Sequence, residues 1–241
     1  MRTILGVDTA NRFGSVALAV DGTALAWGTL DPGEHSSGLS RAAESLLREQ
    51  NLNFRDLSGV AVSQGPGSFT GLRIGLAWAK GICFGLPAKL TLVSAHEANA
   101  YRHRFARGII ATVLQGERGQ VQASLWSAGV RPGSLWGPER IAEEDLADAL
   151  REAAGPKSAE IAVAAPDLKP GIRELLTEAG YVLLDGGPEP PGGGSGANPL
   201  PPTAAAVAEL GDRNLLAGQI EDLADAAPSY GRAPNARKPS S

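Results

Sequence analysis

The sequence predicts an α/β fold of two lobes, each built from a mixed β-sheet with flanking helices. Short strand patterns alternate with helix patterns through the first 105 residues, as expected for a sheet that helices cover. A strand-turn-strand pattern then starts again near residue 109, although no residues repeat. At 241 residues, with 43% hydrophobic content, the chain is long enough to bury two cores of about 100 residues each.

The first thirty residues predict an antiparallel three-stranded sheet. Strand patterns cover residues 3–7, 15–20 and 24–30. Asp21 and Gly22 join the last two strands, and such a pair accepts the positive φ angles of a tight hairpin turn. Both faces of the second strand are apolar, so we expect helices or loops to cover both sides of this sheet.

An amphipathic helix is predicted next, over residues 37–50, because apolar side chains recur there at helical spacing. They are Leu39, Ala42, Ala43, Leu46 and Leu47. A strand over 59–63 leads through a glycine-rich segment into a second helix, 70–84. A strand over 90–93 and a third helix, which a capping-box pattern starts at Ser94, complete the first lobe.

The second half of the chain continues with shorter elements. The predicted strands cover 109–114, 121–126, 160–164 and 181–184, and the predicted helices cover 143–153 and 171–179. Residues 186–202 hold twelve Gly or Pro in seventeen positions, which predicts a loop without secondary structure, and Thr203 is expected to cap a last helix. We expect a first lobe over 1–106, a smaller second lobe over 107–202, and a helix with a flexible tail over 203–241 that returns to the first lobe.

The glycine-rich segment allows two interpretations. It lies between a strand and a helix, so its exposed N–H groups can hold an anion, or it is a tight turn that Ser68 or Thr70 caps. It is neither a Walker loop nor a dinucleotide fingerprint, because no Gly-Lys-Ser/Thr follows and the third glycine is absent. The residues that define this loop are Gly65, Pro66, Gly67, Ser68, Phe69, Thr70 and Arg73.

The helix after this loop carries small residues at four-residue spacing. Gly71, Gly75 and Ala79 leave one ridge nearly bare of side chains, and another helix can approach such a ridge closely. The remaining positions make the helix hydrophobic almost all round, so we expect it to be buried within the domain or against another chain.

Composition argues for a cytoplasmic protein that binds no membrane. The single cysteine, Cys83, excludes an internal disulfide and suits a reducing compartment. The apolar run before Asp8 is too short for a secretory signal, and the most apolar window, 72–86, falls short of a membrane span. A net charge of −4 leaves no global positive field for nucleic acid, so any such contact must be local.

The segment 65–75 resembles the signature of the TsaB family, the dimerisation subunits of bacterial tRNA threonylcarbamoyladenosine biosynthesis. Three further segments agree, in order along the chain. Residues 4–10 resemble the family's opening strand, 34–36 its entry to the first helix, and 228–232 its carboxyl-terminal signature. The resemblance implies a two-lobed actin-like (ribonuclease H-like) fold.

The resemblance also implies a non-catalytic scaffold for threonylcarbamoyl modification of the adenosine next to the anticodon in tRNAs reading ANN codons. In this family the catalytic paralogue TsaD holds the metal, the ATPase TsaE takes part, and TsaB dimerises with TsaD. We therefore expect no cofactor on this chain, ATP and metal on its partners, a homodimer when it is alone, and tRNA contact only through the complex. The family pairs through its first two helices, which implies a partner interface of Leu39, Ala43, Leu46, Leu47, Gly71, Gly75 and Ala79.

One departure from the family lies in the second lobe. The family usually carries Asp-Ala-Arg ahead of its second strand there, whereas this chain has Gln115, Gly116 and Glu117. Any nucleotide or partner contact that the family makes through those charges is therefore in doubt for this chain.

Catalytic arrangements are sparse in the sequence. For His35, His96 and His103 we expect surface or capping roles and no metal site, because their spacing does not match a ligand set. The paired-histidine motif of the catalytic paralogue is also absent. Cations of the cluster over 102–107 are expected to offset a helix dipole, although Phe105 among them leaves an RNA contact open.

Two enzymatic alternatives remain open. An ATP-dependent small-molecule kinase of the actin-like fold would use Asp8 and the glycine-rich loop. We otherwise interpret Asp8 and Thr9 as a vestigial nucleotide site whose side chains hydrogen-bond the turn backbone. A protease would use Ser68 or Cys83 as its nucleophile, but neither has a histidine nearby in the sequence.

Overall fold

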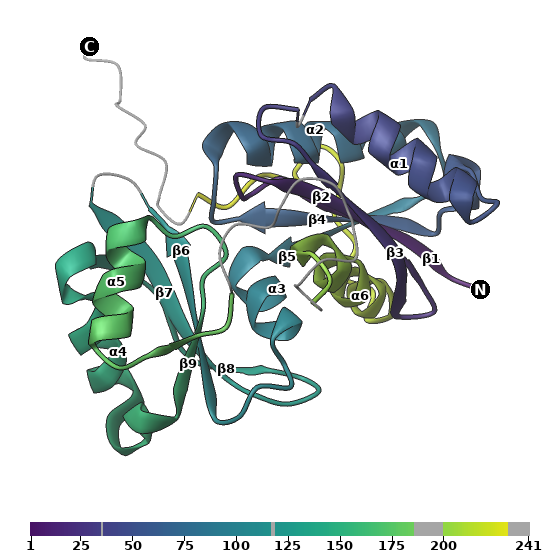
Figure 1. The fold of residues 1–241 in the computed structure, drawn as a ribbon. Helices are drawn as coiled ribbons and strands as arrows, with labels where there is room; N and C mark the ends of the chain where they lie inside the picture. The colour runs from purple at the N-terminus through teal and green to yellow at the C-terminus, as the bar shows by residue number, and fades with distance from the viewer. Residues whose placement is uncertain (35, 117–118, 186–199, 231–241) are drawn as a thin grey trace, which may run out of the picture.

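The computed structural model describes residues 1–34, 36–116, 119–185 and 200–230, and these form two lobes side by side (Figure 1). Each lobe contains one five-stranded mixed sheet with helices, which confirms the predicted architecture. Four predictions fall outside the described residues: those for His35, for Glu117, for most of the Gly/Pro-rich loop, and for the tail after Tyr230.

The sheet of lobe 1 has the strand order β3-β2-β1-β4-β5. β1 pairs antiparallel with β2 and parallel with β4. The strands are β1 Thr3–Asp8, β2 Gly14–Val20, β3 Thr23–Leu30, β4 Gly59–Gly65 and β5 Lys89–Ser94. The predicted hairpin turn is confirmed, with positive φ angles of 45° at Asp21 and 82° at Gly22.

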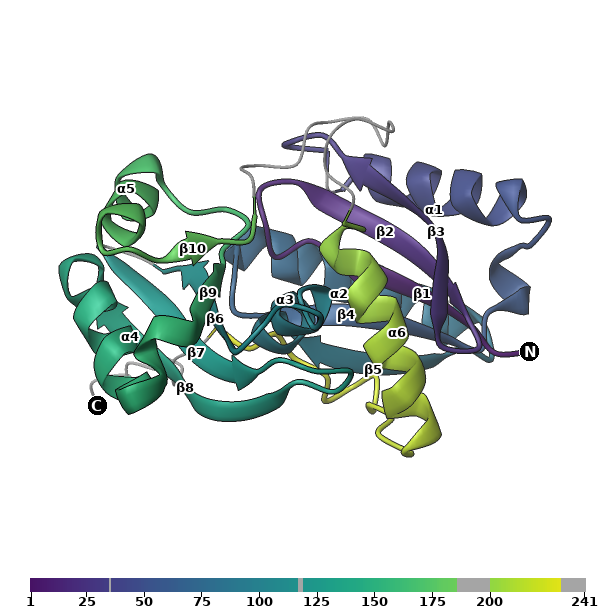
Figure 2. The same cartoon turned by 60° about the horizontal axis from the view of Figure 1, so that its bottom comes forward.

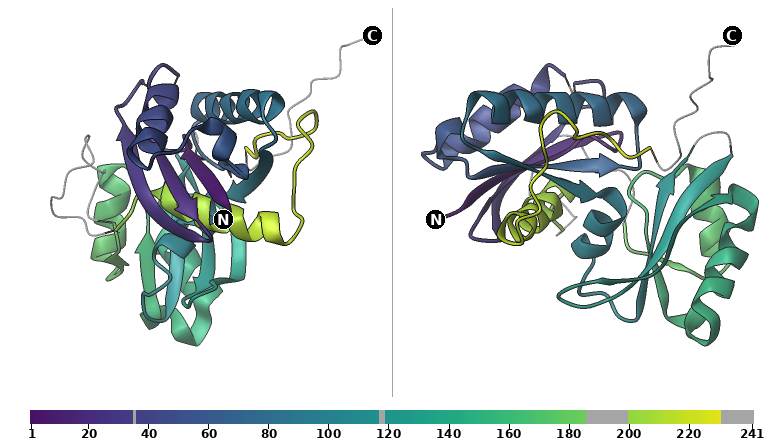
Figure 3. Two further views of the ribbon diagram at one scale, coloured as in Figure 1. Left: turned by 90° about the vertical axis from the view of Figure 1, so that its right-hand side faces the viewer. Right: turned by 180° about the vertical axis from the view of Figure 1, so that it is seen from behind.

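Helices cover both faces of this sheet. α1 (Gly38–Glu49) and α2 (Phe69–Gly85) lie on one face, and α6 (Thr203–Leu216) lies on the other (Figure 3). The apolar stripe predicted for α1 is confirmed, because all but Ala42 of its five residues are buried. α6 approaches β1 so closely that a β-carbon at Gly6 would overlap the carbonyl of Ala204, so β1 requires a glycine there.

The sheet of lobe 2 repeats the topology of lobe 1, with the order β10-β9-β6-β7-β8. Its central strand again pairs antiparallel with the next strand and parallel with a later one, so the second start of the pattern is confirmed as a topological repeat. Its strands are β6 Ile109–Gln115, β7 Gln120–Ser127, β8 Gly133–Ala142, β9 Ile161–Ala164 and β10 Val182–Leu183.

Helices α4 (Leu146–Ala154) and α5 (Pro170–Glu178) cover the outer face of this second sheet. The short helix α3 (Ala95–Arg102) lies between the lobes, against both α6 and β6 (Figure 2). Since both neighbours pack on it, α3 joins the two cores.

Three local predictions were wrong. β8 was not anticipated, because Gly133, Gly137 and Pro138 interrupt its apolar pattern; it is an edge strand, where a proline need not donate to a neighbour. Ser94 makes no side-chain cap to α3. Pro202, not Thr203, occupies the cap position of α6, so Thr203 is instead its first helical residue.

Candidate functional site

The glycine-rich loop meets the carboxyl-terminal signature, although the two are far apart in the sequence. The N–H of Ser229 donates to the carbonyl of Gln64 over 2.7 Å. A β-carbon at Gly65, whose φ is 104°, would overlap the carbonyl of Ser229. The rings of Phe69 and Tyr230 stack with centroids 4.8 Å apart, so both motifs contribute to one local structure.

The loop itself is a tight turn that Ser68 caps. The N–H of Ser68 donates to the carbonyl of Ala10 over 2.8 Å, and its Oγ accepts from the N–H of Gly71 over 3.2 Å. A β-carbon at Gly67 would lie 2.5 Å from the same Ala10 carbonyl. The capped-turn interpretation is therefore confirmed, with Ser68 as the cap and Thr70 already inside α2.

Asp8 and Thr9, at the end of β1, hydrogen-bond the backbone around this turn. Asp8 is buried and accepts from the Ala10 N–H over 3.0 Å and from the Asn11 side chain over 2.8 Å. Burial raises the pKa of Asp8, and these hydrogen bonds oppose that rise. The hydroxyl of Thr9 donates to the carbonyl of Gly71 over 2.8 Å. Both side chains therefore connect the loop and the helix. For Asp8 this confirms the interpretation that its carboxylate hydrogen-bonds the turn backbone.

The ridge of Gly71, Gly75 and Ala79 faces inward. β-carbons at the two glycines would overlap Thr9, and Ala79 is fully buried in the core of lobe 1. The α1 members of the expected interface are also core residues; they are Leu39, Ala43, Leu46 and Leu47. The expectation that these seven residues form a partner surface must therefore be corrected, because the chain already buries them.

A second small-residue ridge on α2 faces outward. Ala77, Gly81 and Gly85 are exposed at four-residue spacing, and β-carbons at the two glycines would meet nothing within 4 Å. Trp78 lies beside this ridge; its indole N–H donates to Ser40 Oγ of α1 over 2.9 Å. Phe84, whose exposed fraction is 87%, lies near the carboxyl end of α2 beside the same ridge. α1 and α2 therefore present an open, partly apolar surface.

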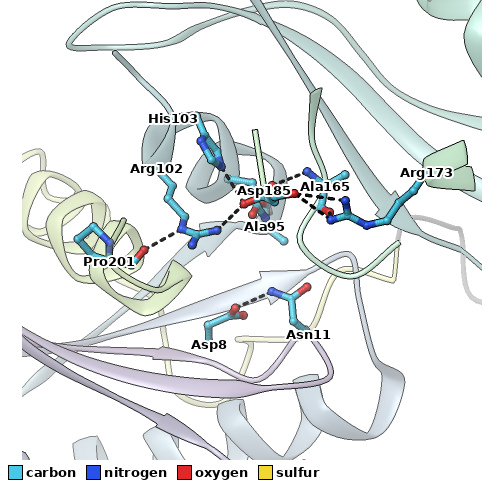
Figure 4. Close-up of polar contacts among 10 residues, drawn as sticks. Asp8, Asn11, Ala95, Arg102, His103, Ala165, Arg173, Asp185 and Pro201 are labelled. Carbon is cyan, nitrogen blue, oxygen red and sulfur yellow. Dashed lines mark hydrogen bonds and ion pairs between the residues drawn. The ribbon is translucent and has the colours of Figure 1, made fainter. Parts of the chain in front are cut away.

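A buried ion-pair cluster fastens the lobes together (Figure 4). Asp185 Oδ1, at the end of lobe 2, accepts from Arg102 over 2.6 Å and lies 3.0 Å from His103 Nε2. Its Oδ2 accepts from the N–H of Ala165 over 2.6 Å. The same guanidinium of Arg102 donates to the carbonyl of Pro201 over 2.7 Å. This cluster therefore joins α3, both sides of the Gly/Pro-rich loop and the end of β9.

The charge state of Asp185 follows from these partners. Burial alone would raise its pKa, but the hydrogen bond from His103, the charges of His103 and Arg102 and the Ala165 N–H together hold that pKa below its ordinary value. Asp185 was missed in the sequence; an acid directly after the predicted strand over 181–184 was the available signal.

Arg102 lies in the last turn of α3 and His103 at its C-cap position, as expected for cations near a helix end, but the cluster over 102–107 is only partly a basic surface. Arg102 and His103 are buried against Asp185. Arg104 pairs with Glu209 of α6 over 3.3 Å and packs over Tyr101. Only Phe105, 75% exposed, and Arg107 face outward, so most of these cations stabilise the junction between the lobes.

His96 is also buried and its ring contacts Thr112 and not a helix end, so its expected surface or capping role is wrong. Its Nδ1 lies 2.7 Å from Thr112 Oγ1, which in turn lies 2.7 Å from Ser124 Oγ. Trp126 donates to Ser124 over 2.8 Å. Burial lowers the pKa of His96 to about 4, so the ring is neutral near pH 7.

The nucleophile candidates are not activated. Burial raises the pKa of Cys83 to about 11, and the thiolate is the reactive form. No histidine of the described chain hydrogen-bonds Ser68 or Cys83. Across the described ranges, no three His, Cys, Asp or Glu side chains gather as metal ligands, and no helix is long and apolar enough to cross a membrane.

A cleft of about 970 Å³ opens between the lobes, next to the glycine-rich loop. Its lobe 1 wall is formed by residues 10–12 and 66–69, and its lobe 2 wall by residues 113–116, the start of β7 and residues 166–170. Asp8 and Thr9 are absent from this lining, while Gln115 belongs to it. The cleft is large enough for a small-molecule ligand.

Comparisons with known proteins agree with the sequence signature. Residues 32–131 match the family model described as TsaD, tRNA N6-adenosine threonylcarbamoyltransferase. The chain is 36% identical over 125 residues to the tRNA threonylcarbamoyladenosine biosynthesis protein TsaB of Bacillus subtilis, covering 52% of this chain and 55% of that protein. It is 34% identical to its Escherichia coli namesake, over 46% of this chain and 49% of that protein. The chain thus matches about half the length of these curated relatives.

A solved structure of YeaZ from Pseudomonas aeruginosa extends the likeness to the whole fold. It is 22% identical, covers 95% of this chain and 100% of that chain, and has a TM-score of 0.71. A second structure from the same organism, described as similar to peptidase YeaZ, also has a TM-score of 0.71 at 22% identity, over 96% of this chain and 100% of that chain. The fold is therefore the two-lobed actin-like fold. The chain is therefore similar to TsaB proteins over about half of its sequence and to the YeaZ structures over nearly all of its fold.

Proposed function

We propose that this chain is a non-catalytic scaffold subunit in tRNA threonylcarbamoyladenosine biosynthesis, and that it dimerises with a TsaD-type catalytic partner. The observation that carries the proposal is the set of matches to proteins of that pathway. ATP and metal belong to the partners in this scheme, which include a TsaE-type ATPase, and tRNA is contacted through the complex. When alone, the chain forms a homodimer in the cytoplasm.

The outward face of α1 and α2 is the proposed dimer surface. Ala77, Gly81 and Gly85 leave a ridge on which a partner helix can pack closely. Half-buried Trp78 and exposed Phe84 flank the ridge, and aromatic residues of this kind often supply much of the energy of an interface.

A substitution at Gly81 tests this surface. Gly81→Leu fills the ridge, while the monomer should keep or slightly gain stability, because nothing lies within 4 Å and leucine favours a helix over glycine by nearly 1 kcal/mol. Sedimentation should show dimer affinity falling at least about tenfold. Gly171→Leu is the matched control, since Gly171 is an exposed, open glycine of α5 in lobe 2. Unchanged dimerisation by Gly81→Leu would rule out this surface.

The scaffold role is tested by reconstitution. TsaD-type and TsaE-type partners should modify tRNA only when this chain is present, and the Gly81→Leu variant should restore less modification than Gly171→Leu. Full modification without the chain contradicts the proposed role. ATP hydrolysis by the purified chain alone would instead favour the kinase alternative, which the buried and hydrogen-bonded Asp8 does not support.

A further inference from the structure

Two loops at one end of lobe 2 form a surface outside both the interlobe cleft and the α1–α2 face. One is the connection from α3 to β6, residues 103–108, and the other is the turn between β7 and β8, residues 128–132. The N–H of Gly129 donates to the carbonyl of Arg104 over 2.8 Å, and a second main-chain hydrogen bond, from Ala128, joins the same loops (Figure 2). We call this surface the loop pair.

The loop pair exposes apolar side chains of a kind that folded proteins usually bury. Phe105 is 75% exposed and Val130 is 66% exposed. Their smaller neighbours Ala106 and Ala128 pack inward against a buried apolar cluster, which anchors both loops. The guanidinium of Arg104 lies over one face of the Phe105 ring, 4.8 Å from the centroid. The rest of that ring is therefore held in place and open to solvent.

The loop pair is also positively charged, in a chain whose net charge is −4. Neither loop contains an Asp or Glu, and each contributes one exposed arginine, Arg107 or Arg131. Within the described ranges, no carboxylate forms an ion pair with either of them, although the main chain of Glu160 packs against the first loop. Arg104 is neutralised by Glu209 over 3.3 Å. The excess charge is therefore that of the two exposed guanidinium groups.

An open aromatic ring between guanidinium groups matches the chemistry of single-stranded nucleic acid. Every base has a flat face that can stack on such a ring, and the flanking cations neutralise the phosphates on either side of that base. An apolar protein partner would leave the charges of Arg107 and Arg131 without counter-charges. A purely acidic partner would gain nothing from the exposed ring of Phe105. Only a ligand that is both aromatic and anionic uses both features of the loop pair.

We propose that the loop pair contacts an unpaired stretch of the tRNA directly, within the complex that the chain forms through its α1–α2 face. Phe105 stacks on one base, Arg107 and Arg131 contact neighbouring phosphates, and Val130 offers apolar surface to the next nucleotide. Arg104 fixes the ring from its covered face. The identity of the RNA rests on the proposed function, whereas the contact itself lies on lobe 2 and is separate from the dimer surface on lobe 1.

Fluorescence anisotropy on the full, purified chain tests the contact, with a labelled oligouridine of about 12 nucleotides as the probe. In low salt we expect a Kd of about 0.1 mM that weakens as salt is added. A duplex RNA of the same length should bind at least about threefold more weakly, because its bases are already stacked on one another. No change in anisotropy at about 1 mM protein, or a duplex that binds as tightly as the single strand, overturns the proposal.

An aromatic substitution assigns the stacking to the loop pair. Phe105→Ala should weaken oligouridine binding at least about fivefold, and the fold should persist because the side chain is exposed. Trp27→Ala is the matched control, since Trp27 is an aromatic residue of β3 in lobe 1 that is 43% exposed; it should change binding less than about twofold. Equal weakening by both variants refutes the assignment.

A charge substitution assigns the phosphate contacts. Arg107→Gln with Arg131→Gln should weaken binding at least about fivefold and reduce its dependence on salt. Arg55→Gln with Lys89→Gln removes two exposed cations of lobe 1 and should change affinity less than about twofold. If the two double variants lose the same affinity, the attraction is non-specific and the loop pair is not the site.

Reconstituted tRNA modification separates this contact from the scaffold role. Phe105→Ala should raise the KM for tRNA at least about threefold without changing dimerisation, whereas Gly81→Leu should weaken dimerisation without changing oligouridine binding. If Phe105→Ala weakens binding of a TsaD-type or TsaE-type partner but not of RNA, the loop pair is a protein interface and the proposal is wrong. Its failure leaves the scaffold role intact, because the requirement for this chain in tRNA modification is measured separately.

Discussion

Asp185→Asn should be the most destabilising conservative substitution between the lobes. The change keeps the shape of the side chain but removes the negative charge that faces Arg102 and His103. The side chains of both partners are almost fully buried, 2% and 3% exposed, so water cannot replace the lost counter-charge. Breaking a buried ion pair on one side costs about 3–5 kcal/mol. Because asparagine still accepts hydrogen bonds, we expect about 3 kcal/mol.

Urea unfolding followed by circular dichroism measures this cost, with the free energy extrapolated to water. Asp148→Asn is the matched control: Asp148 pairs with Arg151 at the surface and its side chain is 86% exposed, so we expect at most about 0.5 kcal/mol. A double-mutant cycle with Arg102→Met isolates the pair, and its coupling should exceed about 1 kcal/mol. A cost below about 1 kcal/mol for Asp185→Asn, or an additive cycle, would refute the reasoning.

Further predictions concern single sites in α2 and α3. The folded pKa of His96, about 4, lies below the unfolded value of about 6.5, so the unfolded chain binds more protons and stability is lost as pH falls from 6.5 toward 4. Between pH 7 and pH 5 the loss should be about 2 kcal/mol, and urea titrations should show it disappear in His96→Gln. Gly75→Ala should destabilise by about 1–3 kcal/mol despite better helix propensity, because its β-carbon overlaps Thr9; a gain in melting temperature would contradict this. Ser68→Ala removes the α2 cap and should cost about 1 kcal/mol in the same assay. Cys83 should react with a thiol reagent at pH 8 about 100-fold more slowly in the native than in the unfolded protein, and equal rates would disprove its burial.

The structure contains the strands and helices that local sequence patterns predict. One strand, β8, was not predicted, and its residues show why. Strand periodicity is visible only when a strand buries one face, and most residues of β8 are exposed. Gly137 and Pro138 add turn-like residues, which normally mark the end of a strand. Only pairing with β7 makes this segment a strand, and such pairing cannot be inferred from the segment itself.

A capped turn was one of two interpretations of the glycine-rich loop and is confirmed, but the side of α2 that faces the core was predicted wrongly. This helix has two ridges of small residues, one through Gly75 and one through Gly81, and helical spacing identifies both equally well. Which ridge faces inward depends on the position of Thr9, more than sixty residues earlier in the chain. Contacts across such separations also created the Asp185 cluster, because no local pattern indicates that Asp185 pairs with Arg102 and His103.

The first lobe is built from two distant stretches of the chain, whereas lobe 2 is continuous from β6 to β10. α6 covers one face of the lobe 1 sheet, and Ser229 completes the glycine-rich loop. During synthesis, all of lobe 2 therefore leaves the ribosome before lobe 1 has its last helix. The usual order, in which the amino-terminal unit finishes first, is reversed. Until α6 has been synthesised, the nascent chain exposes the apolar face of β1, β2 and β4 that α6 later covers, and the signature loop can assemble only after Ser229 has left the ribosome.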